Sequence, residues 1–169
     1  ATSLEFDFTP LTNFISFNYI FASNEYQDYF PCEYSDGFAF LIKEAGSSTN
    51  YENIAVLPGT TTPVSSTNVH PLINDFNSSS GIISGCPAIN QTYFNGYNSF
   101  NSPVNYSGQT KVLTAQTYVI PNKTYHIKLV IADDEEEYYD SAVFLEAGSF
   151  SSKIDLGQDR LLVNNNAVC

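Results

Sequence analysis

The stretch ISFNYIF, residues 15–21, alternates large apolar side chains with polar ones. One face of an extended chain here receives four apolar residues: Ile15, Phe17, Tyr19 and Phe21. Ser16 and Asn18 fall on the other face. A period of two residues is the pattern of a strand with one buried face. The stretch therefore predicts a half-buried β-strand.

Similar patterns recur along the chain between Gly, Pro and Asn residues. Six further strands are predicted, at residues 4–8, 38–42, 54–57, 112–120, 125–131 and 142–145. No segment shows a convincing helical period, so helix is expected to be a minor component. Seven short strands with such punctuation predict an all-β fold: a two-sheet antiparallel β-sandwich, jelly-roll-like, with long loops.

Composition narrows the class of protein. The 169 residues include 12 Tyr and 13 Phe but no Met or Trp, which is typical of strands and turns. The formal net charge is -12 with only 6 Lys plus Arg, so the chain would repel a polyphosphate and nucleic-acid binding is excluded as a function class. No stretch approaches the ~20 apolar residues of a membrane helix, so no membrane span is expected.

The three cysteines are an odd number, so one internal bridge leaves one thiol over. We predict that Cys32 and Cys86 pair, because both lie beside proline in loop-like sequence. No CxxC or Cys/His spacing favours zinc, which is the alternative. A disulfide indicates an oxidising compartment. Cys169 is expected to find its partner outside this chain.

The densest charge lies in residues 133–140, DDEEEYYD, which hold six acids within eight residues between two predicted strands. Such crowding of like charge opposes folding unless a cation neutralises it. A loop that offers only oxygen ligands, without His or Cys, suits Ca²⁺ better than zinc or copper. The alternative interpretation is a solvated acidic turn without an ion.

A second acidic group surrounds Cys32. If the two acidic loops meet at one end of the sandwich, four carboxylates could share one ion: Glu25, Asp36, Asp133 and Asp140. Asp134 and Asp28 are further candidate ligands. The alternative is that Asp36 caps a turn and Glu25 is solvated.

Residues 88–109 interleave five asparagines with aromatic side chains. Exposed Tyr rings can stack on sugar faces or peptide side chains, and Asn amides can hydrogen-bond hydroxyls. The candidate ligand-binding residues are Tyr93, Asn95, Tyr97, Asn98 and Tyr106. The alternative is that Tyr93, Phe94 and Phe100 fold back over the sandwich as a lid.

Several blocks of the sequence resemble the choice-of-anchor L domain of secreted and surface proteins, chiefly of Bacteroidetes. They include FNYIFASNEY at 17–26, SDGFAF at 35–40, TYHIKL at 124–129 and YDSAVFLEAGSF at 139–150. The chain departs from the usual pattern at Asn24, where a glutamate is common, and in its more acidic loop at 133–137. The resemblance implies an exported, multidomain bacterial surface protein that carries Ig-like repeats, and it brings no established catalytic residues.

A shift in composition after Phe150 predicts the domain boundary. Residues 1–150 are expected to form the choice-of-anchor L-like domain, and residues 151–169 a linker and the start of a following Ig-like repeat.

The sequence therefore predicts a non-enzymatic, calcium-dependent adhesion module at the extracellular surface. Its expected partners are a glycan or a peptide or protein ligand, and the adjoining Ig-like domains. A passive structural spacer is the alternative. A glycoside hydrolase-like enzyme is less favoured, because no Gly-x-Ser-x-Gly, His-Glu-x-x-His or phosphate-binding glycine loop is present, and His126 falls on the polar face of a strand.

Overall fold

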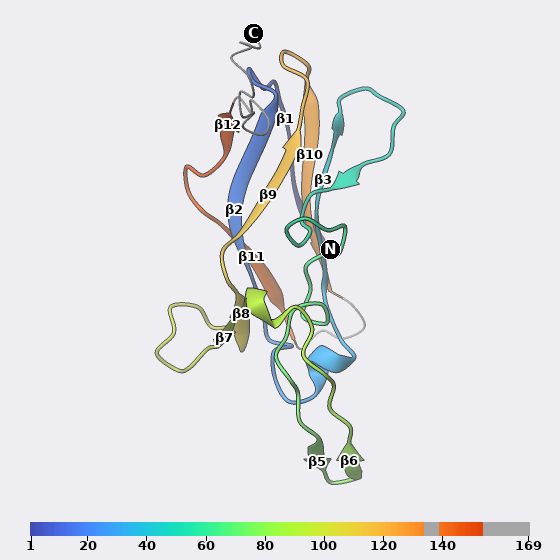
Figure 1. The fold of residues 1–169 in the computed structure, drawn as a ribbon, viewed down its shortest axis with the longest axis vertical. Helices are drawn as coiled ribbons and strands as arrows, with labels where there is room; N and C mark the ends of the chain where they lie inside the picture. The colour runs from blue at the N-terminus through green and yellow to red at the C-terminus, as the bar shows by residue number, and fades with distance from the viewer. Residues whose placement is uncertain (134–138, 154–169) are drawn as a thin grey trace, which may run out of the picture.

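The computed structural model describes residues 1–133 and 139–153, which form two facing antiparallel sheets (Figure 1). The first sheet runs in the order β1 (Thr2–Phe8), β10 (Tyr125–Ala132), β3 (Gly37–Glu44) and β4 (Glu52–Asn53). This arrangement confirms the predicted all-β, two-sheet antiparallel sandwich.

The second sheet is built around β2 (Phe14–Ser23). One edge of β2 pairs with β11 (Ser141–Leu145) and β12 (Ser151–Lys153). The other edge pairs with β9 (Leu113–Tyr118) and β8 (Gly108–Thr110), and β8 pairs in turn with β7 (Phe94–Tyr97).

Short elements complete the fold. A separate hairpin of β5 (Phe76–Ser78) and β6 (Gly81–Ile83) projects from the end of the sandwich that carries the β3 entry (Figure 1). The helices in the described part of the chain are two single 3-10 turns, η1 (Phe30–Cys32) and η2 (Gln91–Tyr93).

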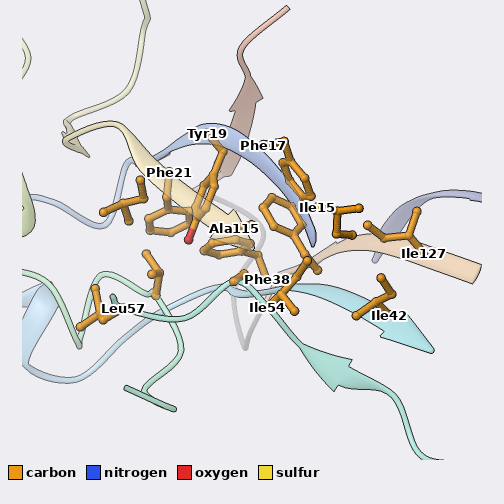
Figure 2. Close-up of a cluster of buried hydrophobic side chains, with 14 of the residues drawn as sticks. Ile15, Phe17, Tyr19, Phe21, Phe38, Ile42, Ile54, Leu57, Ala115 and Ile127 are labelled. Carbon is orange, nitrogen blue, oxygen red and sulfur yellow. The ribbon is translucent and has the colours of Figure 1, made fainter. Parts of the chain in front are cut away.

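The core lies between the inner faces of the two sheets (Figure 2). The alternating residues of β2 that the sequence singled out are all buried, and they pack against β3. Ring centroids lie 5.0 Å apart for Phe21 and Phe38, and 4.9 Å apart for Tyr19 and Phe40. Aromatic pairs of this geometry add about 0.5 to 1.5 kcal/mol each beyond their buried area. The core is therefore held largely by aromatic packing across the two sheets.

The strand predicted at residues 54–57 is wrong. The ladder with β3 ends at Asn53, whose side-chain Oδ1 accepts hydrogen bonds from Phe40 N (3.1 Å) and Ala55 N (3.0 Å). Because this side chain takes the place of a backbone acceptor, the chain turns away from β3. Leu57 is still buried, and residues 55–57 pair with 62–64 through an isolated antiparallel bridge, Val56 with Pro63, and form no longer strand.

The chain after Phe150 remains in the sandwich for three residues, because Ser151–Lys153 pair with residues 14–16 of β2. Of the linker and Ig-like start expected at 151–169, residues 154–169 lie outside the described residues, so the domain assignment stays a prediction. No helix in residues 1–133 and 139–153 is long and apolar enough to cross a membrane.

Candidate functional site

The two acidic loops meet at one end of the sandwich. Gly37 of β3 pairs with Ala132 of β10, so Asp36 and Asp133 come next to that pair at the same end of the first sheet. In the second sheet Asn24 N donates to Asp140 O at 3.0 Å. The strand register thus brings backbone positions from both loops together.

Glu25 lies at the centre of this end and is only 3% exposed. Its Oε2 accepts hydrogen bonds from Ser66 Oγ at 2.8 Å, Asp36 N at 3.0 Å and Ser23 Oγ at 3.3 Å. Burial raises the pKa of Glu25 above its ordinary value. The carboxylate is therefore not solvated, and it joins three separate segments from inside the protein.

The other candidate calcium ligands are distributed differently. Asp36 is 3% exposed, whereas Asp28, Asp133 and Asp140 are exposed. Asp134 lies outside the described residues. Within the described part of the chain, no three His, Cys, Asp or Glu side chains gather as a metal-binding group. Calcium binding stays a prediction, and it concerns chiefly the turn at 133–140.

The disulfide prediction is confirmed. Cys32 and Cys86 are bonded, with Sγ atoms 2.06 Å and Cα atoms 5.7 Å apart. The bond ties η1 to the long segment between β4 and β7. Cys86 also exchanges two backbone hydrogen bonds with Ile73, of 3.0 and 3.1 Å. The third cysteine, Cys169, lies outside the described residues.

The aromatic segment divides into anchored and exposed parts. Tyr93 and Phe94 are half-buried and pack against the core, as the lid alternative expects. Phe100 is fully exposed and forms no part of a lid. Asn95 is exposed and Tyr97 is 56% exposed, so both are accessible to a ligand.

The remaining two candidates hold the loop between β7 and β8, which projects sideways in Figure 1. Asn98 Nδ2 donates to Tyr106 O at 2.9 Å and to Gln109 Oε1 at 3.3 Å. The Tyr106 ring lies edge-on to Phe144, with centroids 6.1 Å apart. These contacts give Asn98 and Tyr106 structural roles within the loop.

A hollow of about 640 Å³ opens beside Tyr93, between β9 and the chain that follows β4. Its floor is apolar and includes Leu57 and Leu113. Its polar wall consists of four hydroxyl and amide side chains, Thr60, Thr92, Thr114 and Gln116, and two charged ones, Glu52 and Lys111. Sequence reasoning found Tyr93 but missed the four polar residues, because they come from segments far apart in the chain and share no local motif.

The two histidines lie away from this hollow. His126 is on the outer face of the first sheet, with Nδ1 2.6 Å from Asp7 Oδ1 and Nε2 3.4 Å from Glu5 Oε2. His70 is buried, and its Nδ1 lies 2.8 Å from Pro71 O. Neither histidine lines the hollow.

Comparison with known proteins gives one family. The family model described as Choice-of-anchor L domain matches residues 1–151. No curated protein and no solved structure matches the chain. The matched family is one of surface-protein modules and is not a known enzyme family.

Proposed function

The chain belongs to the choice-of-anchor L domain family and is a module of a cell-surface protein, and we propose that it binds an extracellular glycan in the hollow beside Tyr93. The observation that supports this proposal is the composition of the hollow. An aromatic ring, hydroxyls and an amide converge there on one concave surface of the sandwich.

A sugar ring has an apolar face and a rim of hydroxyls. Tyr93 can stack on that face, while Thr92, Thr114 and Gln116 can exchange hydrogen bonds with the rim. The backbone of Tyr93 is held by two hydrogen bonds, from Tyr93 N to Asn90 O at 3.0 Å and from Lys111 N to Tyr93 O at 2.8 Å, and its side chain packs partly against the core. Fixed groups lose little entropy when a ligand binds, which favours affinity.

The neighbouring β7 extends the same surface. Asn95 and Tyr97 are exposed on this strand, next to the segment that carries Tyr93. A longer glycan would reach them. A peptide is the other possible ligand for these rings, but its backbone N–H and C=O groups would need hydrogen-bond partners in the hollow.

We further propose that Ca²⁺ binds the acidic segment 133–140 and stabilises the adjoining end of the sandwich. The support is the register that places Asp36 and Asp133 at one end of the first sheet, together with the exposed Asp140 at the start of β11. Oxygen ligands on adjoining loops suit the flexible coordination of Ca²⁺.

A glycan array tests the proposal, run once with calcium and once with a chelator. The strongest hit is then titrated against Thr92→Ala and Gln116→Ala, with Asn77→Ala as the matched control on the distant β5–β6 hairpin. We expect a several-fold loss of affinity, up to about tenfold, for each hollow variant, because each removes a hydrogen bond of ~0.5 to 1.5 kcal/mol.

Two outcomes would contradict the proposal. If no glycan binds in either buffer, the spacer interpretation is favoured. If Asn77→Ala weakens binding as much as Gln116→Ala, the glycan binds elsewhere on the domain.

A further inference from the structure

One side of the sandwich is bordered by an edge strand from each sheet. In the part of the chain that the structure describes, β1 pairs with β10 alone and β11 pairs with β2 alone. Both are edge strands, and the two edges flank the same open side of the sandwich, because both line the cavities there. Edge strands carry backbone groups without strand partners, which other chains can use.

An apolar groove runs between these two edges. Two adjoining cavities of about 210 and 280 Å³ form it, and they share Leu4, Leu129 and Leu145 as lining residues. Leu4 is 56% exposed and Leu145 is 46% exposed, although both line cavities that reach the core residues Phe17 and Phe40. Within residues 1–133 and 139–153, the second sheet thus has no strand that covers the inner side chains of β1.

The backbone of β11 is oriented to accept such a strand. Asn24 N donates to Asp140 O, and Glu146 N donates to Asn18 O, each at 3.0 Å. In an antiparallel ladder successive residues alternate between facing the partner and facing away. The N–H and C=O groups of Val143 and Leu145 therefore point to the free edge, beside the groove.

Charge distinguishes the two ends of the groove. Two exposed acids stand at one end, where Asp133 follows β10 and Asp140 precedes β11. One stands at the other end, Glu146, which lines the second cavity and whose Oε2 already accepts a hydrogen bond from Asn18 Nδ2 at 2.7 Å. The chain as a whole carries a net charge of -12. The end of the groove beside Asp133 and Asp140 therefore attracts a cationic side chain most strongly and repels an acidic one.

We propose that this groove binds an extended segment of a partner protein, which adds as a strand to the free edge of β11. Its alternate side chains are apolar and cover Leu4 and Leu145, and Lys or Arg follows at one end. Antiparallel pairing with β11 places the carboxyl end of the segment beside Asp140, so the basic residues belong at that end. This mode of recognition combines main-chain hydrogen bonds for affinity with side-chain pockets for specificity.

The inference goes beyond the proposed function, because the groove is lined by none of the residues of the glycan hollow. The probe is a synthetic peptide of seven residues, as long as β1, with alternating Val and Thr and two C-terminal Lys in addition. One comparison peptide has the Lys pair at its amino end. Another has Pro at its central position, which removes a strand hydrogen bond. Binding is followed by fluorescence anisotropy of a labelled peptide.

We expect saturable binding that is strongest for the peptide with C-terminal Lys and roughly tenfold weaker for the Pro peptide, equivalent to about 1.4 kcal/mol. Leu4→Ser should weaken binding by a similar factor. Leu72→Ser is the matched control, since Leu72 is 61% exposed and lies outside the groove. Val143→Pro, which removes a free-edge N–H and the Val143 side chain that lines the first cavity, should also weaken binding, with retained folding checked by its melting curve.

Three results would overturn the proposal: no saturable binding up to millimolar peptide, equal losses for Leu4→Ser and Leu72→Ser, or a dimer of the domain that Leu4→Ser dissolves, which would assign the groove to a second copy. Gln116→Ala should leave peptide binding unchanged. Leu4→Ser should likewise leave glycan binding unchanged, so the two proposals fail separately.

Discussion

The Cys32–Cys86 bond should contribute several kcal/mol to the stability of the domain. The two residues are 54 positions apart, and closing a loop of that length in the unfolded chain corresponds to about 4 kcal/mol on the chain-entropy relation. Native disulfides cost about 2 to 5 kcal/mol when removed. For a domain of this size about 1 kcal/mol lowers the melting midpoint by ~2 to 4 °C.

The assay is thermal unfolding of the double variant Cys32→Ser with Cys86→Ser, which keeps Cys169 as in the natural chain. We expect the midpoint to fall by about 8 to 16 °C, which is the loop-closure free energy of about 4 kcal/mol multiplied by ~2 to 4 °C for each kcal/mol. Reducing agent should lower the midpoint of the natural chain similarly and leave the double variant unaffected. A fall of less than about 2 °C would contradict this estimate, because closing the loop would then contribute little to the stability of the domain.

Three other perturbations test separate parts of the structure. Burial raises the pKa of Glu25, so its stabilising contribution is complete below the ordinary pKa of 4.5 and is lost as pH rises through the raised pKa. Measured in chelator, the unfolding free energy of the natural chain minus that of Glu25→Gln should therefore fall as pH rises above 4.5, and a flat difference would contradict this. Calcium at a hundredfold excess over its Kd should raise the unfolding free energy by ~2.7 kcal/mol, magnesium should raise it much less, and Asp133→Asn should reduce the gain from calcium. Equal melting midpoints in calcium, magnesium and chelator would contradict calcium binding at 133–140. Gly108→Ala should cost ~1 to 3 kcal/mol, because the new Cβ would lie 2.6 Å from Cβ of the buried Tyr26, while Gly37→Ala, whose Cβ meets nothing nearer than 3.9 Å, should be neutral in the same urea titration.

The strands that build the core were predictable because their side chains alternate. Residues 15–21, 38–42 and 125–131 each carry apolar residues with a period of two, and each lies in a central strand. The short strands β5 to β8 were missed. They hold three or four residues each, mostly Gly, Asn, Ser or Gln, and their pairing depends on neighbours and not on local pattern.

The candidate site was predictable only where one residue type carries the signal. Cys32 and Cys86 stand out because cysteines are few, and Tyr93 because it is aromatic in a polar segment. Gln116 and Thr114 look like the outer face of any strand, and only the packing of β9 beside the chain after β4 makes them a wall. The buried hydrogen bonding of Glu25 was not predictable, because its bond to Ser66 joins residues 41 positions apart.

Backbone NMR during titration with the array hit shows whether the hollow beside Tyr93 holds a glycan. Amide shifts should change first at the hydroxyl and amide residues that line the hollow: Thr60, Thr92, Thr114 and Gln116. Shifts confined to residues 98–107 of the projecting loop, or no shifts at a saturating glycan concentration, would contradict it.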